Sequence, residues 1–381
     1  MKFNKMTAME YCDFVTDGTH DSPKAKESGR PLITSKHLNR YEIDFSTAKL
    51  ISEKDYQKVI ERSPVEQWDI LFSMIGTIGN LYIETNENTE YACKNMGIFK
   101  MGGDSKKSKW LYYYLQSPKI REYISGVARG TTQGYVPLGA LRSLPIEVPN
   151  DDIRDKITDI LWSIDQKIKI NIEINKNLSD VIQTIYQERF TSNLQGKLSD
   201  ICTYSKERIP VDELTLDEYF STENMLPNKA GVITATSLPS TAQTTKCHIG
   251  DVLISNIRPY FKKILYCHDE GGCSSDVLCF SPSSKKLSAF LYGVLYSDSF
   301  FDFMVAGSKG TKMPRGDKQQ IMTYPIYMPT SDELDEYNAI AIPMLNDIYR
   351  NAKESLNLSS LRDTLLPRLI SGEIDVSSIE I

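Results

Sequence analysis

The chain has 381 residues, of which 40% are hydrophobic, so it is long and apolar enough for two or three globular domains and is not a disordered chain. It contains no run of about 18 apolar residues and begins with a polar segment, so we expect a cytoplasmic protein without a membrane span or signal peptide. Seven irregularly spaced cysteines argue against a disulfide framework.

The charged residues are unevenly distributed along the chain, whose net charge is −6. Residues 1–150 carry 20 basic and 18 acidic side chains, and residues 191–330 carry 14 of each. The acidic excess lies in residues 151–190 and 331–381, which carry 6 and 4 basic against 8 and 10 acidic side chains. Each of the two larger segments is near neutral and could present a local basic face, so net charge neither supports nor refutes nucleic-acid binding.

The first 150 residues predict a compact α+β domain. A polar turn at 17–23 precedes an apolar strand that ends in the glycine-containing turn 75–79. A helix is expected from Trp110 to about Gly126, and it is followed by the polar loop 129–134. The strand Leu-Pro-Ile-Glu-Val-Pro at 144–149 closes this segment.

Residues 151–190 predict one long helix. Its apolar residues recur in alternating steps of four and three, the spacing of a coiled-coil seam, and two asparagines interrupt them: Ile157, Leu161, Ile164, Ile168, Asn171, Asn175, Leu178, Ile182 and Ile185. A polar residue inside a seam costs stability but fixes register and partner. The alternative is a helix packed only on its own domain, but about 35 residues at 1.5 Å each reach roughly 50 Å, which is longer than a small domain needs.

The second half of the chain repeats the first at an offset near 180 residues. Its strand and turn at 249–260 correspond to 67–79, and its loop Ser-Lys-Gly-Thr-Lys from Ser308 corresponds to the loop from Ala128. A helix from Ser288 to about Ala306 is the expected counterpart of the first one. Because these features recur in the same order, we expect a second, related domain at 191–330.

A looser helical pattern follows at 331–381, with apolar residues at Leu334, Tyr337, Ala341, Leu345, Ile348, Ala352 and Leu356. Pro343 is expected either to bend this helix or to mark its true start. The predicted fold is therefore α+β, with two pseudo-symmetric α/β domains separated by two long helices that pair as an antiparallel coiled coil.

The motifs at both ends of the chain resemble a known family. The run Asp-Gly-Thr-His-Asp-Ser-Pro at 17–23 and the segment 29–38 are similar to the start of a target-recognition domain in type I restriction–modification specificity subunits. The run from Leu365 to Val376 resembles the end of that family's C-terminal helix. No Asp-Gly-Thr-His run follows residues 196–200, so the second domain departs from the pattern and we expect the two domains to read different sequences.

The resemblance implies a DNA-recognition subunit without catalysis of its own. Each domain would read half of a split target in double-stranded DNA, and the paired helices would fix the gap between the half-sites. Two methyltransferase subunits holding S-adenosylmethionine would dock on the helices and modify adenine N6, and endonuclease subunits using ATP and magnesium would join them. This chain itself would hold no cofactor.

Phosphate contacts need Lys or Arg, and base-edge contacts need Arg, Asn, Gln, Ser or Thr. The polar loops that follow the helix in each domain supply these side chains at matching places, so they are the first candidates; either could also be a plain solvated loop. Further candidates lie in the opening motif and in the strand-end turns. The expected DNA-binding residues are Thr19, His20, Lys36, Arg40, Thr77, Arg129, Gly130, Thr131, Thr132, Gln133, Arg258, Tyr260, Lys309, Gly310, Thr311, Lys312 and Arg315.

Metal binding and catalysis are weakly indicated. A hairpin centred near Arg258 would bring Cys247-His248 and Cys267-His268 together, but adjacent strand residues point to opposite faces, so one face would hold at most two of these ligands. The run 256–260 only partly matches the Asn/Asp-Pro-Pro-Tyr/Phe motif of adenine methyltransferases. We therefore expect neither a metal site nor an enzyme. The alternative function is a protein-interaction scaffold in which the two repeated domains bind protein rather than DNA.

Overall fold

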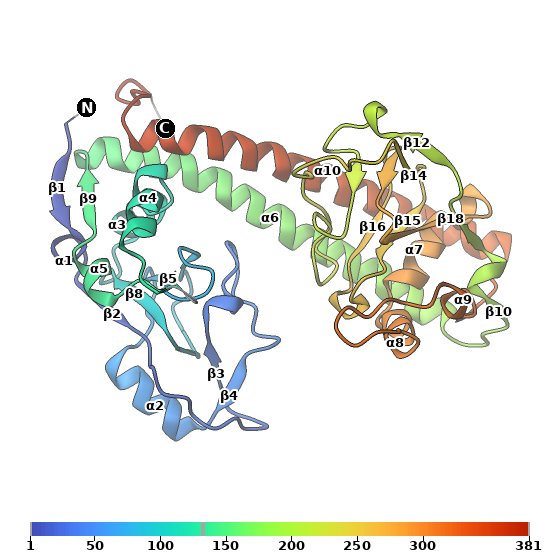
Figure 1. Cartoon of the computed structure of the whole chain (residues 1–381), viewed down its shortest axis with the longest axis horizontal. Coiled ribbons are helices and arrows are strands. Elements are labelled where there is room, and N and C mark those ends of the chain that lie inside the picture. Colours follow the sequence, from blue (N-terminus) through green and yellow to red (C-terminus); the bar gives the residue numbers. More distant parts are fainter. Residues whose placement is uncertain (1, 131–133, 380–381) are drawn as a thin grey trace. The chain divides into compact units, whose positions relative to one another are not determined.

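The computed structural model describes residues 2–130 and 134–379, and the chain folds into two compact units (Figure 1). Unit 1 comprises Met1–Lys169 and Leu358–Ile381, and unit 2 comprises Ile170–Asn357. Two helices of 40 residues each, α6 (Asp151–Phe190) and α10 (Ser331–Ile370), contribute one stretch to each unit.

Unit 1 is built on three small sheets with the strand orders β2-β8-β5-β6, β4-β3-β7 and β1-β9. The central strand β5 is buried along its whole length and pairs antiparallel with both β6 and β8. The strands are β1 (Asn4–Thr7), β2 (Phe14–Asp17), β3 (Arg30–Ile33), β4 (Lys49–Ile51), β5 (Ile70–Ser73), β6 (Leu81–Ile83), β7 (Ala92–Cys93), β8 (Met96–Lys100) and β9 (Pro145–Val148).

The short helices of unit 1 are α1 (Ala8–Tyr11), α2 (Glu53–Arg62), α3 (Ser105–Tyr114), α4 (Pro118–Val127) and α5 (Leu138–Arg142). The single helix expected from Trp110 to Gly126 was wrong, because the chain forms α3 and α4 there. Pro118 causes the break: it stands at the first position of α4, where a missing N–H is tolerated, and in a helix interior it would remove a hydrogen bond.

Unit 2 repeats this arrangement with the strand orders β11-β18-β15-β16, β12-β14-β17-β13 and β10-β19. Here the central strand β15 is buried and pairs antiparallel with β16 and β18. The strands are β10 (Gly196–Lys197), β11 (Cys202–Tyr204), β12 (Arg208–Pro210), β13 (Tyr219–Phe220), β14 (Gln243–Cys247), β15 (Val252–Ser255), β16 (Ile264–Tyr266), β17 (Gly271–Cys273), β18 (Val277–Pro282) and β19 (Pro325–Ile326).

The short helices of unit 2 are α7 (Ser288–Tyr296), α8 (Asp298–Ala306) and α9 (Lys318–Ile321). The expected single helix from Ser288 to Ala306 was therefore also wrong. Ser297 separates α7 from α8, and its hydroxyl accepts a hydrogen bond from the Phe300 amide, which caps the start of α8.

Each unit has its own apolar core, to which both long helices contribute. In unit 1, the fully buried Trp110 and Phe72 pack with Leu161 of α6 and Leu369 of α10. In unit 2, the core combines Ile182, Tyr186 and Phe190 of α6 with Tyr337 and Leu345 of α10 and with Phe290 of α7. The predicted α+β fold, with two similar halves and two long helices, is confirmed.

The seam asparagines of α6 bind α10 within unit 2. The amide nitrogen of Asn175 donates to the Ile348 carbonyl over 3.0 Å, and its amide oxygen accepts from Asn351 over 2.9 Å. Asn171 is buried and donates to the Ser355 hydroxyl over 3.2 Å. Partner numbers fall as the numbers along α6 rise, so the two helices are antiparallel in this unit. Because α10 begins at Ser331, Pro343 does not mark its start.

Candidate nucleic-acid interface

Several predicted contact residues of unit 1 lie at one end of its four-stranded sheet. The strand register places Asp17 of β2 opposite Gly97, and Ser73 of β5 opposite Met96, so β2 and β5 both end where β8 begins. Antiparallel pairing thus brings the segment after residue 17 and the segment after residue 73 to the same end of the sheet.

Two loops lie at this end of the sheet and form loop pair 1, defined by the described residues 74–80, 128–130 and 134–136. Ile75 pairs with Tyr135 in an isolated bridge, and the Val136 amide donates to the Met74 carbonyl over 2.9 Å. Arg129 and Tyr135 exchange two backbone hydrogen bonds of 2.8 Å, which tie the second loop at its base. Gly130 follows with a φ of 101°, which a residue with a Cβ rarely adopts.

The same construction recurs in unit 2 as loop pair 2, defined as residues 256–263 and 308–316. Ile257 pairs with Arg315, and Lys309 and Arg315 exchange backbone hydrogen bonds of 2.9 and 3.0 Å. Gly310 has the same φ of 101° as Gly130. Even the strand-end serines agree, since the Ser73 hydroxyl donates to the Ile75 carbonyl and the Ser255 hydroxyl to the Ile257 carbonyl, both over 3.2 Å. The sequence repeat is therefore a repeat of loop geometry.

In unit 1, four predicted residues are exposed on or beside loop pair 1. Thr77 and Arg129 are exposed on its two loops. Lys36 is exposed on the short helix η1 (Ser35–His37), which adjoins the turn because a Cβ on Gly76 would lie 3.4 Å from the Ser35 hydroxyl. His20 is exposed at the same sheet end. Thr131, Thr132 and Gln133 lie outside the described residues.

The ring of His20 lies between two polar neighbours, Asp17 at the end of β2 and Asn95 just before β8. Its Nδ1 lies 2.9 Å from the amide oxygen of Asn95, and its Nε2 lies 2.9 Å from a carboxylate oxygen of Asp17. Asp17 is buried and also binds Arg62 over 2.7 Å. Sequence reasoning missed Asn95 and Asp17 as orienting residues, although Asp17 belongs to the opening motif.

Two predicted contacts are engaged inside unit 1. Thr19 is buried, and its hydroxyl accepts a hydrogen bond from the Asp21 amide over 3.0 Å. The guanidinium of Arg40 lies 3.5 Å from a carboxylate oxygen of Asp165 of α6. The structure thus gives both side chains internal partners rather than a place on the exposed loops.

In unit 2, the predicted residues lie together on loop pair 2. Arg258 has a φ of 49°, and its amide donates to the Pro314 carbonyl over 2.8 Å, which joins the two loops. Tyr260 is 49% exposed on the short helix η4 (Pro259–Phe261), with its ring centroid 4.8 Å from that of Phe261. Gly310, Thr311 and Lys312 are exposed at the tip of the second loop.

Carboxylates hold several cations of loop pair 2. Lys309 binds Asp317 over 2.6 Å, and Arg315 binds Asp276 over 3.0 Å. The hydrogen bond from Lys309, with backbone amides at the start of α9, lowers the pKa of Asp317. No local pattern indicated the Asp276 contact, because 39 residues separate Asp276 from Arg315. Asp317 could have been found as a helix N-cap.

Lys262 of loop pair 2 forms a further lysine pair with Lys229. Lys229 and Lys262 both bind the same carboxylate oxygen of Asp298 over 2.8 Å. Their hydrogen bonds lower the pKa of Asp298. Sequence reasoning missed this cluster, since nothing in the chain links residue 229 with residue 262 before folding.

The cysteine–histidine pairs separate as the strand alternation predicts. Cys247 and Cys267 are buried in one apolar cluster, whereas His248 lies near Glu207 and Glu270. His268 stacks on Tyr349 with ring centroids 4.6 Å apart, and burial lowers its pKa to about 4. Within residues 2–130 and 134–379, no group of three or more His, Cys, Asp or Glu side chains could hold a metal ion.

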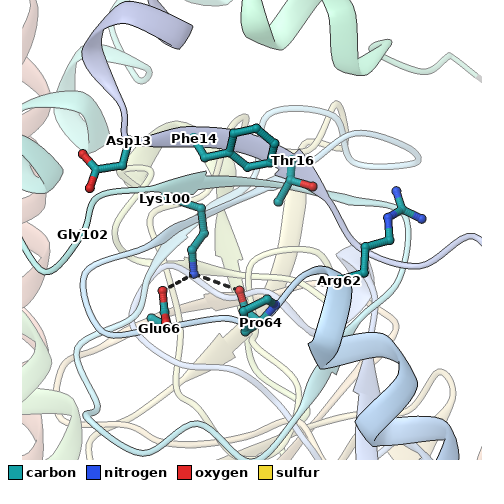
Figure 2. Close-up of a pocket in the computed structure, with 8 residues that line it drawn as sticks. All are labelled: Asp13, Phe14, Thr16, Arg62, Pro64, Glu66, Lys100 and Gly102. Carbon is teal, nitrogen blue, oxygen red and sulfur yellow. Dashed lines mark hydrogen bonds and ion pairs between the residues drawn. The ribbon is translucent and has the colours of Figure 1, made fainter.

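A separate hollow of about 230 Å³ lies in unit 1 beside β2 and β8 (Figure 2). Its two cations are engaged within the protein: Lys100 binds Glu66 over 2.6 Å and the Pro64 carbonyl over 3.0 Å, and Arg62 binds Asp17. The hollow therefore offers no unpaired cation for an anionic ligand, and the loop pairs remain the candidate surfaces.

Comparison with known proteins gives concordant results. Residues 23–180 match the type I restriction modification DNA specificity domain. The chain is 23% identical to the type I restriction enzyme MjaIX specificity subunit of Methanocaldococcus jannaschii over 424 aligned positions, which cover 96% of this chain and 92% of that protein. It is also 23% identical to the HindI specificity subunit of Haemophilus influenzae over 133 residues, 34% of this chain and 29% of that protein.

A solved structure shares the fold. The type I restriction–modification S subunit from M. genitalium superimposes with a TM-score of 0.55 at 16% identity, covering 97% of this chain and 96% of that one. In the part of this chain that the structure describes, no helix is long and apolar enough to span a membrane. The domain match over residues 23–180 and the nearly full-length match to a specificity subunit show that this chain is similar to type I restriction–modification specificity subunits.

Proposed function

We propose that this protein recognises a split sequence in double-stranded DNA and directs partner enzymes to it in the cytoplasm. The observation that carries the proposal is the repeated loop pair. Both units present a loop after their central strand and a second loop tied beside it, with hydroxyl and basic side chains exposed. Such side chains are the ones that contact phosphates and base edges.

The two surfaces differ in chemistry, which supports the reading of two different half-sites. Loop pair 1 exposes Thr77 and Arg129. Loop pair 2 exposes Tyr260, Lys309 and Arg315. Because base readout depends on the few side chains that reach the groove, surfaces with different side chains prefer different bases.

The long helices are the proposed docking elements for two methyltransferase subunits and, through them, for endonuclease subunits. Ile170, Ile174 and Val181 are large apolar residues of α6 that remain exposed, at helical spacings of four and seven. An exposed apolar stripe is typical of a surface that a partner covers. S-adenosylmethionine, ATP and magnesium are then proposed to belong to these partners.

The test is to co-express the chain with the methyltransferase encoded beside it and to map N6-methyladenine across the host genome. We expect a bipartite motif with a fixed gap that disappears when this chain is omitted. Replacing residues 1–150 with those of a related protein should change one half of the motif and leave the other half intact. Methylation that is absent, or unaffected by this chain, would contradict the proposal.

The alternative, a scaffold whose repeated domains bind protein, is separated by salt dependence. Binding that neutralises several phosphates releases counterions, so the logarithm of the DNA association constant should fall steeply and linearly with the logarithm of salt concentration. Titration of a duplex carrying the mapped motif between 50 and 200 mM salt, a range over which phosphate contacts have large effects, measures this slope. Weak, salt-insensitive association with every duplex would favour the scaffold.

A further inference from the structure

The backbone of Arg315 is held by both loops of loop pair 2. Its backbone pairs with Lys309 through hydrogen bonds of 2.9 and 3.0 Å, and it also forms a bridge with Ile257. Both loops of the pair therefore fix the point from which its side chain starts. The side chain is 56% exposed, so it extends from a fixed base towards the surroundings.

The guanidinium of Arg315 is fixed as well. Its Nη2 donates to a carboxylate oxygen of Asp276 over 3.0 Å. Asp276 is itself anchored, because its carbonyl accepts from the Asn256 amide over 2.8 Å at the end of β15. A guanidinium is a rigid planar fork with five N–H donors, so one bond to Asp276 leaves donors available in a defined orientation.

The carboxylate also influences which ligand Arg315 prefers. A phosphate approaching Arg315 would come close to the negative charge of Asp276, whereas the edge of a base is neutral. The neighbouring Lys312 is different: it is exposed and has a flexible stem, and no ion pair with another described residue is seen. The ion pair thus favours a neutral acceptor for Arg315, while Lys312 suits phosphate.

We propose that Arg315, oriented by Asp276, reads a guanine in the half-site bound by unit 2, through the O6 and N7 acceptors in the major groove. The inference rests on the proposed function and adds a base and a residue to it. Arginine pairs with these two acceptors because both lie within reach of its fork. Unit 1 has Tyr135 at the corresponding loop position, so its half-site lacks this reader.

The first experiment maps the methylated motif for variants of the full chain in complex with its methyltransferase. We expect Arg315→Lys, which keeps the charge but removes the fork, to relax one guanine position of one half-site. Asp276→Asn should relax the same position to a smaller degree, since it leaves the fork but weakens its orientation. The matched control Lys312→Ala should leave the motif unchanged and reduce methylation at all sites alike.

The second experiment measures binding of duplexes in which each guanine of that half-site is replaced in turn by 7-deazaguanine, which lacks the N7 acceptor. The wild-type complex should bind one of these duplexes between about fivefold and about a hundredfold more weakly than the unmodified duplex. The Arg315→Lys complex should bind that 7-deazaguanine duplex and the unmodified duplex equally. The Lys312→Ala complex should keep the wild-type sensitivity.

Several outcomes would overturn the assignment. They are a half-site without guanine, a wild-type complex indifferent to every 7-deazaguanine, or an Arg315→Lys complex as sensitive as wild type. A different failure, in which wild type has no bipartite motif at all, would instead reject the proposed function. If Asp276→Asn leaves the methylated motif unchanged while Arg315→Lys relaxes it, Asp276 is not the residue that orients Arg315.

Discussion

The two long helices meet by different chemistry in the two units. In unit 1, Asp165 of α6 and Arg362 of α10 form an ion pair of 2.8 Å in which both side chains are only 5% exposed. Tyr113 also donates to Asp165 over 2.8 Å, and Tyr41 donates over 2.9 Å. Burial by itself lowers the pKa of Arg362, but the charges of Asp165 and Tyr41 and the hydrogen bonds to Asp165 and Asp363 together raise that pKa.

At an offset of 180 residues, unit 2 has Leu345 in place of Asp165 and Ile182 in place of Arg362. Both are buried in its apolar core, beside aromatic residues such as Phe190 and Tyr337. The comparison shows that the repeat preserves where the helices pack, whereas the type of contact is free to change. A buried ion pair adds little net stability over an apolar pair, but it is intolerant of losing one partner.

The largest expected effect follows from removing one member of the ion pair. Asp165→Leu leaves the buried Arg362 with only the exposed Asp363 as a carboxylate partner, and it should destabilise unit 1 by about 3–5 kcal/mol. Urea unfolding monitored by hydrogen exchange in each unit measures it, and unit 2 should keep its wild-type stability. An equal loss of stability in both units would contradict the expectation that this ion pair stabilises unit 1 alone.

The apolar counterpart should be somewhat less sensitive. Leu345→Ala removes buried methyl groups from unit 2 and should cost about 2–4 kcal/mol, set by how far the site can collapse. The same exchange measurement applies, now with unit 1 as the internal control. A loss below about 1 kcal/mol would show that Leu345 is not tightly packed.

Converting one contact into the other gives a sharper test. The double variant Asp165→Leu with Arg362→Ile gives unit 1 the side chains of unit 2, and it should recover most of the stability that Asp165→Leu loses. About 1–2 kcal/mol should remain missing, because the hydroxyl of the buried Tyr113 loses its acceptor. If the double variant is no better than the single one, the ion pair and the apolar pair are not interchangeable.

The smallest expected effect is a pH dependence confined to unit 2. Burial lowers the pKa of His268 to about 4, below the value of about 6.5 in an unfolded chain. The unfolded chain therefore binds more protons between these values, and the stabilisation present above pH 6.5 is lost as the pH falls towards 4. For this partly buried ring the loss should be about 1 kcal/mol. His268→Phe keeps the stacking on Tyr349 and should remove this part of the pH slope of unit 2 unfolding.

The sequence predicted those features that repeat locally along the chain. The two long helices follow from apolar spacing, and the two loops at each sheet end follow from turn residues after apolar strands. The binding roles of the loops remain predictions. Contacts between distant segments left no local trace: Arg40 lies 125 residues before Asp165, and its approach to α6 depends on packing that no spacing rule contains.

Helix breaks and buried turn residues were also hard to foresee. The apolar pattern continues through Ser117 and Ser297, so only the Pro118 position and the Ser297 cap reveal that each expected helix is two. Thr19 has the hydroxyl that a contact residue needs, but it is buried. For Thr19 burial decided the outcome, and burial is a property of the whole unit.

The discontinuity of unit 1 has a consequence for synthesis of the chain. Its core includes Leu366, Leu369, Ile370 and Val376, all from the final stretch, whereas unit 2 is one continuous segment that ends at Asn357. Unit 1 can therefore complete its core only after the whole segment of unit 2 and residues 358–376 have been made, although unit 1 begins first. This reverses the usual N-terminal-first order of domain folding. A released chain truncated after Asn357 would keep the whole segment of unit 2 but lack Leu366, Leu369, Ile370 and Val376 of the unit 1 core.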